Sequence, residues 1–390
     1  MTTTTDRELV ETQLDILLSD HDPSDRFAFL GAQFDLGLAF VWFPQGLGGL
    51  EVSRGLQRVV DERLLAAGAP SAIKYNILGI GMGAPVLLAH GTPEQQQRWL
   101  RPMYTGEEIW CQLFSEPGAG SDVAALGARA VRDGDEWVVN GQKVWTTIAH
   151  VSKWGMIVTR TDPDVPKHRG MTYFIVDMEA EGVEVRPLRQ ITGEAEFNEV
   201  YFNDVRIPDA YRVGEVGDGW RVTLATLMNE RVAIGATVQP RNAGTIGDLL
   251  EVWRTRGGDE SARDEVARLW VEFEAARLTN LRAASNRHRG TPGPEGSTAK
   301  LVYAELNKKI YEVATDLMGP EAMLYESYDL VRPEEFASIT DLRKAFLRAR
   351  ANSIEGGTSE IMKNILGERV LGLPGEPRVD KDLPWSEVPR

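Results

Sequence analysis

The sequence of 390 residues is poor in features on which several protein classes depend. It has one cysteine, Cys111, so no disulfide within the chain is possible, which indicates a reducing compartment. No histidine lies near Cys111 in the sequence, and a buried apolar cysteine is therefore a simpler interpretation than a catalytic thiol. The longest apolar stretch, 77–89, contains three glycines and a proline and is too short and too interrupted to span a bilayer.

Positive charge is also scarce. The chain has 43 Lys and Arg against 58 Asp and Glu, a net charge of -15. Such a surface repels nucleic acid and anionic membranes, so we expect neither as a partner, and an anionic substrate would need a local cationic or helix-terminal site. The N-terminus lacks a basic region followed by an apolar run, which is not the pattern of a secretory signal and predicts a cytoplasmic protein.

The hydrophobic pattern divides the chain into three blocks, which is consistent with its length. Helical periodicity predicts an N-terminal helical domain over 1–110, where Thr92 is the expected N-cap of a helix with Pro93 at its first position. Short β-branched and aromatic runs predict a β-domain over 111–219, and long amphipathic stretches predict a helical bundle over 220–390. This α+β order, without strand–helix–strand alternation, argues against a doubly wound nucleotide-binding fold.

Two stretches of the β-domain have the composition of a binding site. In FSEPGAGSD, residues 114–122, glycines allow close approach of backbone N–H groups to a ligand, although the same residues are typical of an ordinary Pro-Gly turn. In NGQKVWTT, residues 140–147, Asn140-Gly141 predicts a hairpin turn. Trp145 and Thr147 are expected on one face of a strand, where the tryptophan either packs on an aromatic cofactor or belongs to the core.

Two further stretches carry carboxylates. In NERVAIG, residues 229–235, Glu230 and Arg231 have apolar neighbours; most such pairs lie on a solvated helix face, but a carboxylate desolvated among apolar residues would have a raised pKa. In SIEGGTSEI, residues 353–361, Glu355 and Glu360 flank a glycine pair. The sequence therefore offers more than one candidate for a catalytic base.

Together, six stretches resemble the acyl-CoA dehydrogenase family, in order and over nearly the whole chain: HGTPEQQQRWLRPMYTGE, FSEPGAGSD, NGQKVWTT, EVYFNDVRIP, NERVAIG and GGTSEI. The resemblance implies an N-terminal helical domain, a middle β-barrel domain and a C-terminal four-helix bundle. It also implies an oxidoreductase of lipid catabolism (β-oxidation) that uses FAD to convert an acyl-CoA thioester to the trans-2-enoyl-CoA. An electron-transfer flavoprotein is the implied electron acceptor.

The resemblance also implies roles for individual positions. Residues expected at the FAD are Phe114, Ser115, Gly120, Trp145, Thr147, Thr358 and Glu360. Ser121 would lie near the acyl-CoA phosphates, and Arg231 in the substrate site.

The base is assigned through the register of the last motif. Many members carry it as the Glu of an EGT sequence, but here Gly356 precedes Gly357-Thr358, and Glu355 stands one residue early. Glu230 matches the position used by isovaleryl- and long-chain-type members, so we expect Glu230 to be the base. Gly356 would then donate its backbone N–H to the thioester carbonyl, which requires no side chain.

Departures from the family pattern keep three interpretations open. Relatives often have Gly-Gly-x-Gly where this chain has Met318-Gly319-Pro320-Glu321, in a segment that contacts FAD across a subunit interface. The FAD diphosphate would be met by Arg254, by Arg256 or by the basic residues at 287–289. The leading expectation is a homodimer or homotetramer. The second is a family-like subunit of an α2β2 hetero-oligomer that is inactive or poor in flavin without its partner, and the third is a flavin oxidase or monooxygenase on the same architecture.

Overall fold

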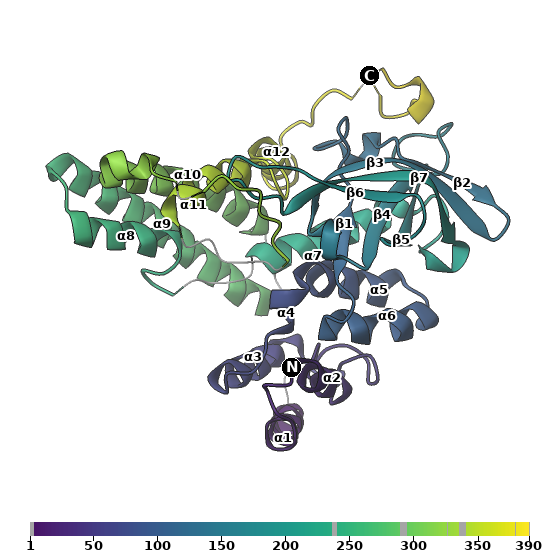
Figure 1. Ribbon diagram of the computed structural model, residues 1–390, viewed down its shortest axis with the longest axis horizontal. Helices are drawn as coiled ribbons and strands as arrows, with labels where there is room; N and C mark the ends of the chain where they lie inside the picture. Colours follow the sequence, from purple (N-terminus) through teal and green to yellow (C-terminus); the bar gives the residue numbers. More distant parts are fainter. Residues whose placement is uncertain are drawn as a thin grey trace.

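The computed structural model describes residues 4–235, 240–288, 295–325, 327–334, 341–378 and 380–389. Helices come first along the chain, then strands, then long helices, which confirms the predicted α+β order (Figure 1). Over the described ranges, no helix has the length and apolar character needed to cross a membrane. The exact domain boundaries stay predictions.

The N-terminal block packs six α-helices and a π-helical turn, Gly79–Gly83, against one end of the sheet (Figure 1). The helices are α1 Thr4–Asp20, α2 Arg26–Asp35, α3 Gln57–Ala66, α4 Ala72–Tyr75, α5 Ala84–His90 and α6 Pro93–Thr105. Thr92 is the N-cap of α6, as predicted, and forms a reciprocal capping box with Gln95. The amide of Gln95 also donates to the carbonyls of Ala210 and Arg212, which ties α6 to the β-domain.

The β-domain is one eight-stranded sheet in the order β6-β7-β3-β2-β4-β5-β8, with β1 paired to β4. The strands are β1 Trp110–Leu113, β2 Arg129–Asp133, β3 Glu136–Thr147, β4 Trp154–Arg160, β5 Met171–Asp177, β6 Val183–Pro187, β7 Phe197–Pro208 and β8 Arg212–Val213. Buried apolar side chains from β1, β3, β4, β5 and β7 form one continuous core. That core fixes the faces of β3, whose C-terminal end carries Trp145 and Thr147.

The predicted hairpin turn at Asn140-Gly141 is wrong. Both residues lie inside β3, at an irregularity where its register with β7 shifts between Val139 and Gly141. A Cβ at Gly141 would lie 2.5 Å from the Ala128 Cβ, so glycine is required by a neighbouring segment rather than by a turn. The chain reverses instead between β2 and β3, where Gly134 has a φ of +64°.

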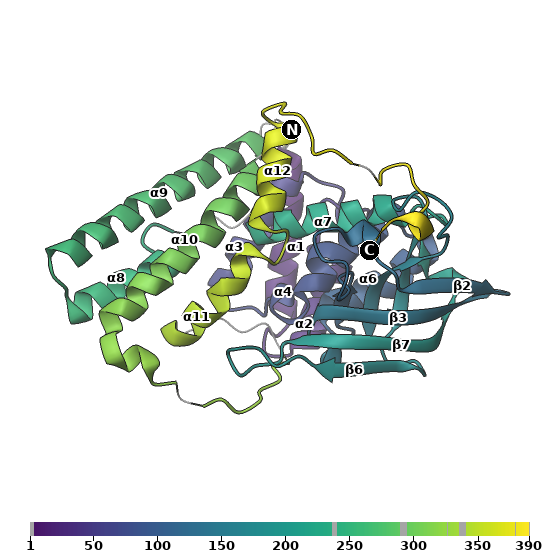
Figure 2. The same cartoon turned by 90° about the horizontal axis from the view of Figure 1, so that it is seen from above.

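The C-terminal block consists of long helices around α10, which packs against α8, α9, α11 and α12 (Figure 2). The helices are α7 Gly219–Gly235, α8 Thr245–Arg256, α9 Glu260–His288, α10 Glu295–Met318, α11 Leu342–Ala349 and α12 Ser359–Arg369. Helix α7 contacts α10 and also packs against α5 and β5, so it lies between the bundle and the sheet. After α12 the chain returns to the sheet, where its last residues lie (Figures 1 and 2).

Candidate active site

A fully buried lysine joins the two β-domain motifs. Lys143 of β3 has no exposed surface, and its ammonium donates to the Phe114 carbonyl at 3.1 Å and to Glu116 at 2.8 Å. The Glu116 carboxylate also accepts from the backbone N–H groups of Gly127 and Ala128. Burial lowers the pKa of Lys143, while the charge of Glu116 acts in the opposite direction. The loop that begins at Phe114 is therefore held against the strand that carries Trp145.

The tip of this loop is open. Gly118, Gly120 and Ser121 are exposed, and a Cβ added at either glycine would meet nothing within 4 Å. Ser115 is half-buried, and its carbonyl accepts from the Val144 N–H at 2.9 Å. Phe114 is buried and packs edge-on against Tyr173. A ligand can thus reach the backbone of the tip, while the base of the loop is fixed.

Trp145 has two unusual properties for a tryptophan in a strand. Its side chain is 57% exposed, and its φ of +61° is one that bulky residues rarely adopt. It lies where β3 shifts register against β7, between Lys143 and Thr146. Thr147 is half-buried and Thr146 fully buried, so the two predicted positions are both more exposed than the residue between them. A strained, exposed aromatic at a bulge is typical of a functional surface.

On the bundle side, the Gly356-Gly357 turn leads into α12. Both glycines have positive φ values, +62° and +95°. Thr358 is the N-cap of α12, and its hydroxyl accepts from the Ile361 N–H at 3.1 Å. Glu360 lies exposed in the first turn. The ammonium of Lys300 on α10 donates to the carbonyls of Asn352 and Gly357 and holds the turn from behind.

Glu355 is fully engaged within the chain. Its two carboxylate oxygens accept from both terminal nitrogens of Arg348, at 3.0 and 2.8 Å, and Asn352 adds a third hydrogen bond at 2.9 Å. Arg348 also pairs with Glu196, whose pKa is raised by burial, at 3.1 Å. Both carboxylate oxygens of Glu355 are therefore occupied by donors of this chain and are held toward Arg348.

Arg348 also connects the two sides of the candidate site. Its guanidinium lies 5.4 Å from the ring centre of Phe197 at the start of β7, and that ring packs edge-on against Trp145 at 5.8 Å. A continuous series of side-chain contacts therefore leads from Trp145 through Phe197 and Arg348 to Glu355. Glu355 precedes Gly356 in the chain. Sequence reasoning did not find Phe197, Arg348 or Lys300, because these residues stand outside the glycine-rich motifs and meet only in the fold.

The predicted base lies on α7. The backbone of Glu230 and Arg231 belongs to this helix, but their side chains lie outside the described part of the structure, as do those at 287–289. Nearby on α7, Met228 is 65% exposed, and the Thr226 hydroxyl lies 3.4 Å from that of Tyr173. The proposed roles of Glu230 and Arg231 therefore stay predictions.

The unusual Gly319-Pro320-Glu321 segment forms a short 3-10 turn at the end of α10. Glu321 forms an ion pair with Arg256, which lowers the pKa of the Glu321 carboxyl. Of the two arginines proposed for a diphosphate, Arg256 is therefore already paired within this chain. This pair offsets the negative charge that Glu321 adds to the segment.

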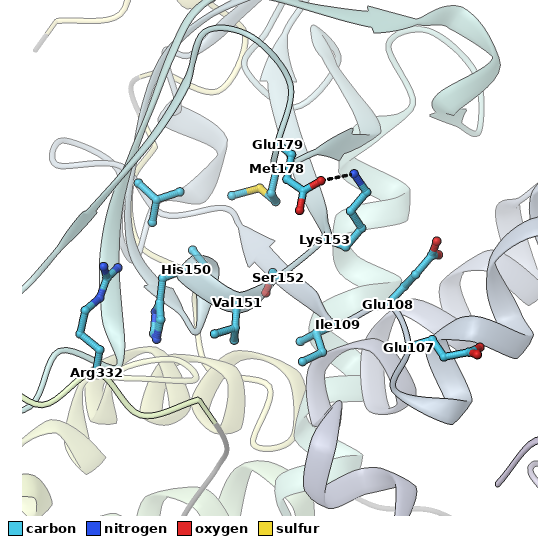
Figure 3. A pocket seen from close by; sticks show the side chains of 12 residues that line it. Glu107, Glu108, Ile109, His150, Val151, Ser152, Lys153, Met178, Glu179 and Arg332 are labelled. Carbon is cyan, nitrogen blue, oxygen red and sulfur yellow. Dashed lines mark hydrogen bonds and ion pairs between the residues drawn. The ribbon is translucent and has the colours of Figure 1, made fainter. Parts of the chain in front are cut away.

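A cavity of about 600 Å³ is lined by residues 107–109 and 149–153, with Met178, Glu179, Val185 and Arg332 (Figure 3). His150 lines it and contacts Asn198 and the Pro333 carbonyl, and Arg332 lies beside it and donates to the same Asn198. Lys153 and Glu179 form an ion pair at its rim. None of the site residues predicted from the sequence lines this cavity. Among the described residues, no group of histidine, cysteine or carboxylate side chains could hold a metal ion.

Three family models match the chain in succession. The acyl-CoA dehydrogenase N-terminal domain matches residues 1–107, the middle domain 111–205 and the C-terminal domain 217–371. Together they account for most of the sequence. Residues 372–390 lie beyond the last match.

Individual relatives point to the same family. The chain is 38% identical to the acyl-CoA dehydrogenase IpdE1 of Mycobacterium tuberculosis, over 87% of this chain and 86% of that protein. It is 27% identical to the short-chain specific acyl-CoA dehydrogenase of Bos taurus, over 94% and 88%. Among solved structures, the ChsE4-ChsE5 complex from Mycobacterium tuberculosis contains a chain of 28% identity with a TM-score of 0.70, over 96% of this chain and 99% of that one.

Proposed function

The chain belongs to the acyl-CoA dehydrogenase family, and on that premise we propose that it converts an acyl-CoA thioester to the trans-2-enoyl-CoA with Glu230 as the base. Membership makes it an oxidoreductase whose cofactor is FAD. When bound, FAD would supply the acceptor for the hydride that leaves the β carbon. The chain's own residues then have to take up the α proton, polarise the thioester carbonyl and keep water out.

The β-domain face fits a flavin. Trp145 offers an exposed aromatic surface beside Thr147, and the open backbone at Gly118 and Gly120 offers N–H donors to a polar ring edge. We propose that Trp145, Thr147, Phe114, Ser115 and Gly120 hold the cofactor on this side. Thr358 and Glu360, at the start of α12, are the proposed contacts from the bundle.

The state of Glu355 supports Glu230 as the base. An α-proton acceptor needs a carboxylate oxygen that is free to approach the substrate proton. Both oxygens of Glu355 are bound by Arg348, and Asn352 adds a further donor. Glu230 has apolar sequence neighbours on α7, where desolvation would raise its pKa toward that of a useful base.

We assign the remaining substrate contacts by the same logic. Gly356 donates its backbone N–H to the thioester carbonyl, from a turn that Lys300 holds through the Gly357 carbonyl. Arg231 lies in the substrate site next to the base. Ser121, exposed at the open loop, contacts the CoA end of the substrate. The electron acceptor is an electron-transfer flavoprotein.

A panel titration tests this function. The purified chain is reduced anaerobically with acyl-CoAs of graded bulk, including straight, branched and steroid-like chains, while flavin absorbance is recorded. Bleaching by one class establishes the dehydrogenase and identifies the substrate class. Flavin that stays oxidised with every acyl-CoA would contradict it, and rapid reoxidation by oxygen would favour an oxidase.

A second candidate, a subunit that is active only with a related partner, rests on exposed apolar side chains at the bundle. Met323 is 80% exposed, Leu324 66% and Leu371 70%. Apolar surface of this kind is typical of a face covered by another chain. The solved relative described as a ChsE4-ChsE5 complex contains two different proteins. Light scattering and flavin content of the purified chain decide: a colourless monomer favours the heteromeric subunit, and a yellow homo-oligomer excludes it.

A further inference from the structure

The chain beyond the family match folds back onto the loop proposed to bind CoA. We call residues 372–378 and 380–389 the C-terminal strap. It leaves α12 on the bundle and runs to the β-domain (Figures 1 and 2). Its contacts there are with the 121–128 and 161–168 segments. The 121–128 segment follows directly on the open glycine loop and begins with Ser121.

Trp385 fastens the strap to the far end of that segment. Its indole N–H donates to the Ala125 carbonyl at 3.2 Å, and a Cβ added at Gly127 would lie 3.6 Å from its ring. The guanidinium of Arg160, almost completely buried, lies 5.0 Å from the indole centre and donates to the Ala124 carbonyl at 2.6 Å. Trp385 and Arg160 thus hold the same short stretch from two sides.

An ion-pair bridge fastens the near end. The ammonium of Lys167 contacts Asp122 at 2.6 Å and Asp380 of the strap at 2.6 Å, and its side chain is only 11% exposed. Asp122 is the neighbour of Ser121 in the chain. One lysine therefore links the strap to the residue next to the proposed CoA contact. Its ammonium is largely shielded from solvent, although Asp122 itself is 53% exposed.

Further backbone contacts lock the strap in one register. The N–H groups of Trp385 and Ser386 donate to the carbonyls of Val165 and Pro163, each at 2.9 Å. The strap thus bridges two loops that are separate in the sequence. These backbone hydrogen bonds, together with the Trp385 and Asp380 contacts, hold the strap in one defined position on the β-domain.

We propose that the C-terminal strap is a specificity element for the CoA end of the substrate. By fixing Asp122, Ala125 and Gly127, it presets the exposed Ser121 and the glycine backbone for the phosphate-bearing carrier. Preorganisation of this kind increases affinity because the loop is already ordered before the ligand binds. The inference rests on the proposed function, in which Ser121 contacts CoA.

The test distinguishes binding of the CoA moiety from binding of the acyl group. We compare Trp385→Ala, Asp380→Asn and a chain ending at Leu371 with the wild type, in binding of desulfo-CoA by calorimetry and in KM for an acyl-CoA and the matching acyl-pantetheine. The control is Asp382→Asn, an exposed strap carboxylate for which the described residues provide no ion pair. We expect Kd for desulfo-CoA and KM for acyl-CoA to rise about tenfold in Trp385→Ala, which corresponds to about 1.4 kcal/mol. In Trp385→Ala we expect kcat and the KM for acyl-pantetheine to stay near their wild-type values. In the control Asp382→Asn we expect every measured constant to stay near wild type.

Two outcomes overturn the proposal: unchanged desulfo-CoA affinity in Trp385→Ala and in the truncated chain, or an equal rise in KM for both thioesters, which indicates general destabilisation. Thermal melting shows whether the truncated chain folds, and the point variants carry the test where it does not. A wild type that binds desulfo-CoA but oxidises no acyl-CoA contradicts the proposed function and leaves the strap testable by binding. A wild type that binds no desulfo-CoA overturns the strap proposal as well.

Discussion

The two sides of the proposed site are built differently. On the β-domain side, the chain itself fixes the loop and strand: Lys143 is buried without exposed surface between Phe114 and Glu116. On the bundle side, Ile354 is 66% exposed and Met323 80% exposed, beside segments proposed to meet the cofactor. The comparison indicates that one side is preformed by buried contacts within the chain, whereas the other presents exposed apolar side chains next to its proposed cofactor contacts.

The largest expected loss of activity comes from a substitution on α7, the helix between the two sides of the site. Glu230→Gln removes the proposed proton acceptor but preserves size, so the rate of flavin reduction by acyl-CoA should fall about 10²- to 10⁴-fold. Flavin content should stay unchanged. Anaerobic stopped-flow reduction measures the rate, and a wild-type rate in this variant would remove Glu230 from the mechanism.

Lys143→Met tests whether the β-domain side is stabilised by the buried Lys143 ammonium. Loss of the ammonium leaves Glu116, whose side chain is only 12% exposed, with its backbone donors alone. Because breaking a fully buried pair costs about 3–5 kcal/mol of unfolding free energy, we expect a loss near the lower end of that range. Urea unfolding measures the loss, with Glu116→Gln added as a second change to restore part of it. The matched control is Lys153→Met, whose partly exposed pair should contribute less than about 1 kcal/mol. Equal effects at both lysines would contradict a preformed side.

A double substitution can move the catalytic carboxylate from α7 to the bundle side of the site. Gly356→Glu combined with Glu230→Gly moves a carboxylate to the position that other members use, and should restore part of the activity and shift the chain-length preference. Because Gly356 has a φ of +62°, the new residue should also cost about 1–2 kcal/mol of stability. Single-turnover rates across acyl chain lengths measure the first effect and thermal unfolding the second. No recovery over Glu230→Gly alone would count against the assigned register.

Glu355→Gln should have a much smaller effect on catalysis. The side chain is held by Arg348 and Asn352 and is not the proposed base, so the reduction rate should change less than about tenfold. It is the matched control for Glu230→Gln under identical conditions. A collapse comparable to that of Glu230→Gln would identify Glu355 as the base after all.

The smallest effect is expected from thiol reagents at Cys111, which is buried in the core of the β-domain. Burial raises the pKa of its thiol to about 12, so the reactive thiolate is disfavoured at neutral pH and remains so up to about that pH. Thiol reagents should leave the folded protein unmodified and react after denaturation, as intact-mass spectrometry would show. Rapid labelling of the native protein would mean that the β-domain core opens.

Local features of the fold followed from the sequence where a few neighbouring residues decide the structure. The cap at Thr92 needs only a hydroxyl and an N–H three residues later, and it was predicted correctly. Asn140-Gly141 was misread because its glycine is required by Ala128, which approaches from another segment. A dipeptide pattern carries no information about such a neighbour.

The sequence alone determined the order of helices and strands, the family and its cofactor, because periodicity and six spaced motifs are properties of the linear chain. The tertiary structure decided which groups are free to act. It placed Arg348 on Glu355, buried Lys143 between two motifs, and brought the C-terminal strap to the loop of Ser121. These pairings join residues far apart in sequence, and their energies depend on distance and burial, which exist only once the chain has folded.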